Sequence, residues 1–476
     1  MTGRAATVGF DLDMTLVDSR PGIAAAFREL SARTGVPIDA EAAVRRLGPP
    51  LPQELAYWFP PEQVDAAVLA YRELYPEYAI APCSLLPGAR EAVEAVRAAG
   101  GRVVVITAKK AELAELHLRH LGLAVDHVYG LAFAEGKTSV LRDSGAVAYA
   151  GDHVADMASA VAAGVPAVGV ATGPCSPAEL AEAGAATVLA DLTGFPDWFA
   201  GHLLALRLAD LDDRLRALGR VVVAYSGGAD SAFVLAAAVR ALGAERVVAA
   251  TAVSPSLPAA ELEQARLLPA QLGVAHLTPR TAELDREGYR ANAGDRCYFC
   301  KAELVETLAP LAAAHAAVIV TGTNADDAVA GFRPGIRAAD ERGAHAPLRD
   351  AGLTKSQVRQ ASRDWQLSTW DKPAAACLSS RIAYGVEISR ERLARVERAE
   401  AALRAALSGA GIAVRDLRVR DLGAEGARVE VDAAAVPLLA ARPDLLACVR
   451  GFDTVVLDPR GFRSGSLNDQ LAERFR

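Results

Sequence analysis

The chain has 476 residues, of which 52% are hydrophobic and 23% charged, and its formal net charge is −7. This length exceeds that of one ordinary domain and predicts two or three. The acidic balance argues against nucleic acid as a partner and favours small-molecule substrates. No apolar run approaches the roughly 18 residues of a membrane span, and Asp11 interrupts any signal-like N-terminal segment, so we expect a cytoplasmic protein. Whether it forms a homo-oligomer stays open.

The first predicted strand begins at Ala6 and ends in the sequence Asp11-Leu-Asp13. On extended backbone, two carboxylates two residues apart point the same way and can share a cation. Further polar residues follow later strands: Thr107 after Val103–Ile106, Lys137 in Glu-Gly-Lys-Thr, and Asp152 and Asp156 in Gly-Asp-His-Val-Ala-Asp. An isolated aspartate is more often a strand end or a helix cap, but four motifs in this order favour a shared site.

Over about residues 5–195 these motifs resemble the haloacid dehalogenase-like hydrolases. The resemblance implies that Asp11 is a phosphoryl-accepting nucleophile and Asp13 a general acid and base, while Thr107 and Lys137 hold phosphoryl oxygens. It also implies a Mg²⁺ site at Asp11, Asp13, Asp152 and Asp156. We therefore expect a Rossmann-like phosphatase domain over residues 1–200. The insert at about 18–82 is expected to be a helical cap, and with Gly48-Pro-Pro-Leu51 it resembles the phosphoglycolate-phosphatase-like branch.

Chain breakers at Leu192–Pro196 and a predicted helix over 200–218 place a domain boundary near residue 205. Beyond it, apolar strands such as Val247–Ala250 and Val318–Val320 alternate with helical stretches, which predicts a second parallel α/β sheet over residues 207–388.

The second block opens with an apolar strand, a Ser-Gly-Gly turn and a helix that is expected to start at Asp230-Ser231. Adjacent glycines allow close approach of the backbone, and the N–H groups and helix dipole converge on a point suited to phosphate. A Walker loop would need a lysine that is missing here. The pattern resembles the pyrophosphate loop of ATP pyrophosphatases, which implies ATP binding and cleavage between the α and β phosphates. The residues that carry this resemblance are Ser226, Gly227, Gly228, Asp230 and Ser231.

Two of the six cysteines, Cys297 and Cys300, are three residues apart and can share one metal ion or cluster. Cys377 also lies in a site-like segment, Trp370 to Arg381. Three thiolates suit an iron–sulfur cluster with one open iron, whereas a closed zinc site normally needs a fourth ligand. The other three cysteines are expected to be small buried residues.

A denser set of motifs over about residues 207–476 resembles the LarE family of ATP-dependent sulfur transferases. The resemblance implies adenylation of a carboxylate of pyridinium-3,5-dicarboxylate mononucleotide and then sulfur insertion, a step toward the nickel-pincer nucleotide cofactor. Some members sacrifice the sulfur of one cysteine at the position of Cys377; others use three cysteines, a [4Fe-4S] cluster and an extra sulfide. The motifs are Ser226–Ser231, Asp295–Lys301, Gly322–Asp327, Arg333–Gly335, Pro347–Leu348, Gly352–Lys355, Trp370–Pro373, Ala376–Ile382 and Gly461–Leu467.

The C-terminal residues 389–476 read as a small α+β domain, with a helix over Arg390–Leu407 followed by two strands of period 2. Arg418 and Arg420 alternate on the first strand, so both could grip substrate or pyrophosphate oxygens, and exposed charges on an edge strand are an equal alternative. Asp326, Asp327 and Glu400 are candidate Mg²⁺ or nucleotide ligands. For Glu400 a solvated helix face is favoured.

Three other functions stay open at this point. A tRNA thiolase of the same superfamily would need an RNA-binding face, which the acidic balance does not favour. An amide ligase resembling NAD synthetase would make the cysteines incidental. A zinc-stabilised binding module would not be an enzyme at all.

Overall fold

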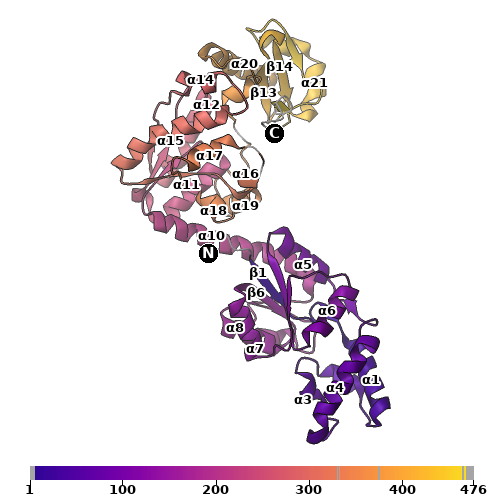
Figure 1. Cartoon of the computed structure of the whole chain (residues 1–476). Coiled ribbons are helices and arrows are strands. Elements are labelled where there is room, and N and C mark those ends of the chain that lie inside the picture. The colour runs from indigo at the N-terminus through magenta and orange to yellow at the C-terminus, as the bar shows by residue number, and fades with distance from the viewer. Residues whose placement is uncertain (1–5, 330, 332, 374–375, 464–465, 468–476) are drawn as a thin grey trace. The chain divides into compact units, whose positions relative to one another are not determined.

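The computed structural model describes residues 6–329, 331, 333–373, 376–463 and 466–467, and it divides the chain into two compact units, Arg4–Leu203 and Leu204–Arg476 (Figure 1). Residues 374–375, in the segment from Trp370 to Arg381, and residues 464–465, in the motif Gly461–Leu467, lie outside the described residues. Within the described residues, no helix has both the length and the apolar character needed to cross a bilayer.

The first unit is built on a six-stranded parallel sheet of order β5-β4-β1-β6-β7-β8. This confirms the predicted α/β architecture, and the sheet agrees with a Rossmann-like domain. Its strands are β1 (Thr7–Phe10), β4 (Arg102–Ile106), β5 (His127–Tyr129), β6 (Ala146–Gly151), β7 (Ala167–Val170) and β8 (Thr187–Leu189).

Helices cover both faces of this sheet, because its strands are apolar on both sides. In β4, Val103 and Val105 pack with α5 and α6, whereas Val104 and Ile106 pack with α7 and α8. Figure 1 shows the two helix pairs on opposite sides of β1 and β6. The helices are α5 (Ala89–Ala98), α6 (Ala111–His120), α7 (Glu135–Asp143), α8 (Val154–Ala163) and α9 (Pro177–Glu182).

The insert after β1 is helical, as predicted, and has a hydrophobic core of its own that includes Phe27, Leu30, Tyr71 and Tyr75. A short antiparallel pair, β2 (Val17–Asp18) and β3 (Ser84–Leu85), joins its two ends to the main sheet domain. Its helices are α1 (Arg20–Thr34), α2 (Ala40–Arg45), α3 (Leu51–Leu55) and α4 (Pro61–Tyr78). We call this insert the cap.

The helix α10 spans Phe195–Leu218 and starts five residues before the predicted Ala200. Pro196 lies in its first turn, where a missing N–H costs no hydrogen bond, so the proline begins the helix rather than breaking the chain. Phe195 and Phe199 pack into the core of the first unit, and Leu211 and Leu215 into that of the second.

The second unit contains a four-stranded parallel sheet of order β11-β10-β9-β12. Its strands are β9 (Val221–Ala224), β10 (Val247–Ala250), β11 (Ala275–Leu277) and β12 (Val318–Thr321). Val221 and Val223 pack with α11 (Ala229–Leu242) and α19 (Lys355–Asp364), whereas Val222 packs with α15 (Arg296–Ala314). Shorter helices complete it: α12 (Ala259–Ala265), α13 (Leu267–Leu272), α14 (Glu287–Arg290), α16 (Ala325–Val329), α17 (Pro334–Asp340) and α18 (Pro347–Asp350).

The same unit ends in a small mixed sheet. In it β13 (Leu417–Asp421) pairs antiparallel with β14 (Ala427–Val431), and β14 pairs parallel with β15 (Val455–Leu457). The predicted long helix is α20 (Arg390–Gly409), which packs Leu403 and Leu407 on this sheet, and a short helix α21 (Val436–Ala440) follows.

Separate 3₁₀ turns occur in both units. They are η1 (Leu192–Gly194), η2 (Ala244–Arg246), η3 (Glu283–Asp285), η4 (Leu378–Arg381), η5 (Gly423–Glu425), η6 (Ala433–Ala435) and η7 (Pro443–Cys448).

Candidate active sites

Three adjacent parallel strands deliver the first site. Asp11 follows β1, Thr107 follows β4 and Asp152 follows β6, and β1 lies between the other two. The carboxyl ends of parallel strands share one edge of the sheet, which is where open α/β sheets bind ligands. All three residues are buried. The topology therefore brings together side chains that are up to 141 positions apart (11 to 152).

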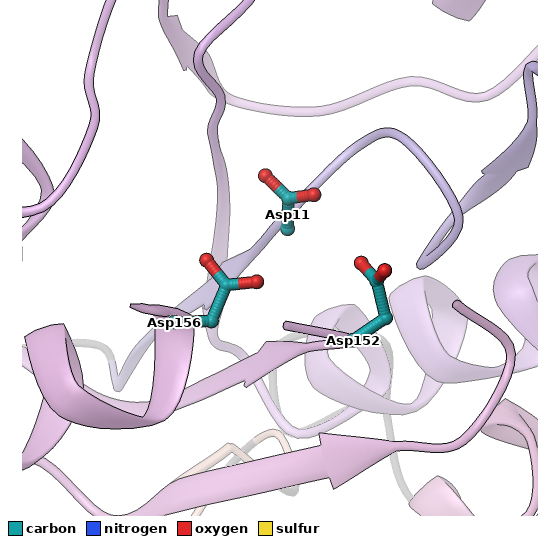
Figure 2. Close-up of side chains that lie close together, drawn as sticks. All are labelled: Asp11, Asp152 and Asp156. Carbon is teal, nitrogen blue, oxygen red and sulfur yellow. The ribbon is translucent and has the colours of Figure 1, made fainter. Parts of the chain in front are cut away.

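Asp11, Asp152 and Asp156 face one another, and one carboxylate oxygen from each lies within 4.8 Å of the other two (Figure 2). The Lys137 ammonium on α7 donates to Asp11 Oδ1 at 2.7 Å and to Asp156 Oδ1 at 2.6 Å. Thr15 Oγ1 donates to Asp152 Oδ1 at 2.9 Å. One lysine thus pairs with two of the three acids, so the site keeps a net negative charge that a cation could compensate.

Burial raises the pKa of Asp11 to about 7; Lys137 opposes this rise, and the carboxylates of Asp156 and Asp13 add to it. The pKa of Asp152 is likewise raised by burial and by the neighbouring acids. Hard carboxylate oxygens at this spacing are the ligands that Mg²⁺ prefers, and a cation would relieve the repulsion. The acidic trio therefore fits a Mg²⁺ site.

Two glycines make room for these carboxylates. A Cβ on Gly151 would lie 2.6 Å from Asp156, and one on Gly173 would lie 1.8 Å from Asp152 Oδ2. Gly151 belongs to the recognised motif, whereas Gly173 comes from a loop after β7 that carries no pattern of its own in the sequence.

Asp13 has a partner that sequence reasoning missed. Lys109 Nζ donates to Asp13 Oδ1 at 2.6 Å and to the Tyr75 hydroxyl at 2.5 Å, and Tyr75 also contacts His117 Nε2 at 2.9 Å. Burial acts to raise the pKa of Asp13, but Lys109 outweighs it, so the pKa lies below its ordinary value. Burial lowers the pKa of His117 to about 3, which keeps this imidazole neutral. The sequence feature that could have pointed to Lys109 is its position two residues after Thr107.

A cavity of about 240 Å³ lies over this site between the sheet edge and the cap. The acids form one wall, and the cap supplies Arg46, Glu54, Arg72 and the Gly48–Leu51 loop. Gly48 touches the His153 ring closely, because a Cβ on it would lie 2.8 Å from His153 Cδ2. The cap is therefore part of the site.

The second site lies where β9 turns into α11. Gly227 has a φ of +73°, a left-handed conformation that glycine adopts without strain, and Gly228 occupies the N-cap position. The helix thus starts at Ala229, one residue before the predicted Asp230-Ser231 start. Ser231 Oγ donates to the Gly228 carbonyl at 3.0 Å. Within the described residues, Asp230 Oδ1 is buried without a hydrogen-bond partner, so it is available to a ligand.

Basic side chains from distant segments line a cavity of about 420 Å³ over this loop. Lys372 Nζ donates to the Gly227 carbonyl at 3.1 Å and to Glu261 at 2.8 Å. Four cations around a helix N-terminus suit a polyphosphate. The cations are Lys301, Lys355, Arg359 and Lys372; three of them fall in quoted motifs, but their convergence was not foreseen.

The two candidate acids after β12 take different positions. Asp327 lines the cavity. Asp326 Oδ2 instead accepts the backbone N–H of Lys355 at 2.8 Å and so holds the start of α19.

The three candidate cluster cysteines lie on two segments of the same unit. Cys297 and Cys300 are in the first turns of α15, and Cys377 directly precedes η4. Cys297 and Cys377 are exposed and Cys300 is half-buried. Burial raises the pKa of the Cys300 thiol, and the nearby Cys377, Glu283 and Cys297 add to the rise. Thiolate formation at Cys300 therefore needs a cation or metal nearby.

Among the described residues, Asp11, Asp152 and Asp156 are the only group of three or more metal-ligating side chains close enough together to bind one metal ion. The three cysteines are not close enough together to do so. A cluster distributes its thiolates over several irons and does not require them to meet at one point. The three cysteine thiolates are therefore of a type that suits an iron–sulfur cluster.

Arg418 and Arg420 are buried, at 8% and 5% exposure, which corrects the alternative of exposed edge-strand charges. Arg420 donates to Glu430 at 2.7 Å and to the Ser380 carbonyl at 2.9 Å. Glu400 is also not solvated: it accepts from Arg381 at 3.0 Å and from the Val419 N–H at 3.0 Å. These bonds join the small sheet to the segment that carries Cys377.

Comparisons with known proteins find relatives of both parts of the chain. Residues 8–170 match the haloacid dehalogenase-like hydrolase family. A phosphoglycolate phosphatase of Rhodospirillum rubrum is 32% identical over 214 residues, which are 40% of this chain and 88% of that protein. A solved haloacid dehalogenase-like hydrolase from Streptococcus pneumoniae is 24% identical, with a TM-score of 0.37, and covers 41% of this chain and 98% of that one.

Two relatives match the C-terminal region. An uncharacterized protein of Synechocystis is 41% identical over 277 residues, 57% of this chain and all of that protein. The pyridinium-3,5-bisthiocarboxylic acid mononucleotide synthase of Lactiplantibacillus plantarum is 32% identical over 274 residues, 57% of this chain and 96% of that protein.

The chain is thus an enzyme with two sites, a phosphohydrolase joined to a mononucleotide-synthase-like region. It belongs to the haloacid dehalogenase-like hydrolases of phosphoglycolate-phosphatase type by its N-terminal part and to the LarE family by its C-terminal region.

Proposed function

We propose that this chain catalyses two separate reactions. The first unit hydrolyses a phosphate monoester. The second adenylates a carboxylate of pyridinium-3,5-dicarboxylate mononucleotide with ATP and then inserts sulfur there, in nickel-pincer nucleotide synthesis. The match over 96% of the Lactiplantibacillus synthase carries the second assignment, and the buried acidic trio carries the first.

In the first site the residues take distinct roles. Asp11 attacks phosphorus and the ester P–O bond breaks, while Asp13 in its protonated form gives a proton to the leaving alcohol. Against the effect of burial, Lys109 lowers the pKa of Asp13, so this form is the minority at neutral pH. Asp13 then takes a proton from water, which hydrolyses the aspartyl phosphate and restores Asp11. Lys137 and Thr107 hold the phosphoryl oxygens. Mg²⁺ bound by Asp11, Asp152 and Asp156 would offset the negative charge that opposes attack by a carboxylate.

In the second site the loop from Ser226 to Ser231 would hold the ATP phosphates. Asp230 and Asp327, which line the same cavity, would ligate the metal ion that accompanies them. A carboxylate oxygen of the substrate attacks the α-phosphorus, and pyrophosphate leaves. The acyl adenylate that results is a good electrophile because AMP is a good leaving group. Arg418 and Arg420 would orient the substrate.

The sulfur source is the finer part of the proposal. Cys297, Cys300 and Cys377 would hold a [4Fe-4S] cluster, which when bound would supply a deprotonated sulfide without consuming protein. That sulfur would take the place of AMP on the acyl carbon. Two segments of one unit carry these thiols, and the bonds of Arg381 to the carbonyl of Cys377 and to Glu400 fix the second segment.

Reciprocal variants test the two reactions in one experiment. Asp11→Asn is expected to abolish hydrolysis of a generic phosphate monoester and to leave sulfur transfer intact. Cys297→Ala, Cys300→Ala and Cys377→Ala should each abolish multiple-turnover sulfur insertion, while ATP–pyrophosphate exchange with the pyridinium substrate persists. Multiple turnover by all three cysteine variants would refute the cluster, and tight co-purification of tRNA would favour a thiolase instead.

A further inference from the structure

The cavity over Asp11 has balanced charges. Five acidic and five basic side chains line it. A divalent cation adds two positive charges, and the phosphate group of a monoester carries close to two negative charges at neutral pH. The phosphate alone therefore completes the balance. The lining residues are Asp11, Asp13, Glu54, Asp152 and Asp156, with Arg46, Arg72, Lys109, Lys110 and Lys137.

One of the two cap arginines that line the cavity is already paired with an acid. Arg46 Nε and Nη2 donate to the two oxygens of Glu54 at 3.0 and 2.6 Å. The guanidinium also lies 4.6 Å from the Tyr57 ring centroid, and Trp58 Nε1 donates to Glu54 at 3.0 Å. Glu54 is only 12% exposed. A bidentate pair of this kind is held firmly and leaves little charge for a second carboxylate.

Apolar side chains form the remainder of the cavity wall. Ile23, Phe27 and Leu51 come from the cap, and Leu113, Leu131 and Phe133 from the sheet domain. Lys109 pairs with Asp13 at 2.6 Å and Lys110 with Glu112 at 3.6 Å, whereas Arg72 has no ion-pair partner within the described residues. The apolar side chains favour an apolar leaving group.

We propose that the first site selects phosphate monoesters of uncharged, largely apolar alcohols, and that Glu54 determines this specificity by neutralising Arg46. The proposal rests on the phosphohydrolase function proposed above. A site with this preference differs from that of an enzyme that hydrolyses phosphoglycolate, because the leaving group of phosphoglycolate carries a carboxylate.

Matched esters test this preference. The full chain with Mg²⁺ is assayed with benzyl phosphate and 4-carboxybenzyl phosphate, which differ mainly in one remote charge. We expect kcat/KM to favour benzyl phosphate by about tenfold, because with Mg²⁺ and the phosphate bound the charged side chains that line the cavity leave no surplus positive charge for a second carboxylate. Glu54→Gln, which keeps an acceptor for Trp58, should shift this ratio toward the carboxylated ester by about tenfold. Glu29→Gln, which removes the ion-pair partner of Arg33 elsewhere in the cap, should leave it unchanged.

Binding gives a readout that does not depend on turnover. Calorimetric titration with benzylphosphonate and (4-carboxybenzyl)phosphonate should show the same preference in the wild type and the same shift in Glu54→Gln. Tighter binding of the carboxylated phosphonate by the wild type would overturn the proposal, as would a selective loss of that ligand in Arg72→Gln. If neither ester is hydrolysed, the phosphohydrolase function fails, and the phosphonates still decide the charge preference.

Discussion

Asp11 carries a charge that its surroundings compensate incompletely. It is 7% exposed, and Lys137, its ion-pair partner at 2.7 Å, is shared with Asp156. Without a metal ion, burial and neighbouring acids raise its pKa to about 7. A site built to receive a cation therefore destabilises the fold when the cation is missing.

The pH dependence of unfolding should reveal this cost. A raised carboxyl pKa means that Asp11 binds its proton more tightly in the folded state than in the unfolded state. Proton binding by Asp11 therefore stabilises the fold fully below the pKa of the unfolded state, and this stabilisation is lost as pH rises from about 4 to about 7. In EDTA, Asp11→Asn should therefore be more stable than the wild type above pH 7, by a few kcal/mol as an order of magnitude, with the difference vanishing near pH 4. Urea unfolding at several pH values measures it.

Adding Mg²⁺ should reverse the order, since the wild type gains more from the cation than the variant does. A pH-independent difference between the two proteins would contradict a raised pKa at Asp11.

Motif order alone identified Asp11, Thr107, Lys137, Asp152 and Asp156, because these residues follow recognisable strands. Tyr75 and Glu54 could not be predicted in this way. They lie on cap helices, and only the packing of the cap brings them to the site. Glu400 shows the converse error: in sequence it lies among charged residues, but α20 turns it toward Arg381 and the N–H of Val419.

Among the elements, strands were predicted most accurately. The strand β10 occupies the predicted Val247–Ala250, and β4 extends the predicted Val103–Ile106 by one residue. Runs of β-branched residues buried on both faces explain this success. Helix starts were less predictable, because Pro196 and Gly228 can serve either as breakers or as first-turn residues.

The cap loop between α2 and α3 should be sensitive to a single methyl group. Gly48 has a φ of +131°, and an added Cβ would lie 2.8 Å from the His153 ring, next to Asp152. Gly48→Ala should therefore displace the loop and lower kcat/KM for a phosphate monoester by roughly tenfold to a hundredfold, since small misplacements are costly in active sites. Steady-state kinetics with Mg²⁺ measures the loss.

Gly35→Ala is the matched control. Gly35 also has a positive φ, +70°, and ends α1 in the same cap, but its Cβ would meet no atom within 4 Å. It should lose about 1 kcal/mol of stability and keep its kcat/KM. Equal kinetic losses in both variants would show that backbone strain, rather than the contact with His153, matters.

At the scale of the whole molecule, each site is complete within one unit. Asp11, Lys137 and the cap all belong to Arg4–Leu203, whereas the Ser226–Ser231 loop, the three candidate cluster cysteines and β13 belong to Leu204–Arg476. Each unit also has its own hydrophobic core. The sequence predicted these two folds because each starts from its own strand and motif, but it holds no signal for why one chain carries both.

Separate cores with separate sites predict two thermal transitions that different ligands stabilise. In calorimetry of the full chain with Mg²⁺, inorganic phosphate should raise only the transition of the first unit, and an ATP analogue with a methylene group between the α and β phosphates should raise only the other. At a hundredfold excess over Kd, binding adds about 2.7 kcal/mol, which is a Tm increase of roughly 5 to 10 °C for units of this size. Asp11→Asn should weaken the phosphate response alone, because phosphate binds through the metal site. A single transition that both ligands raise equally would show instead that the units unfold as one.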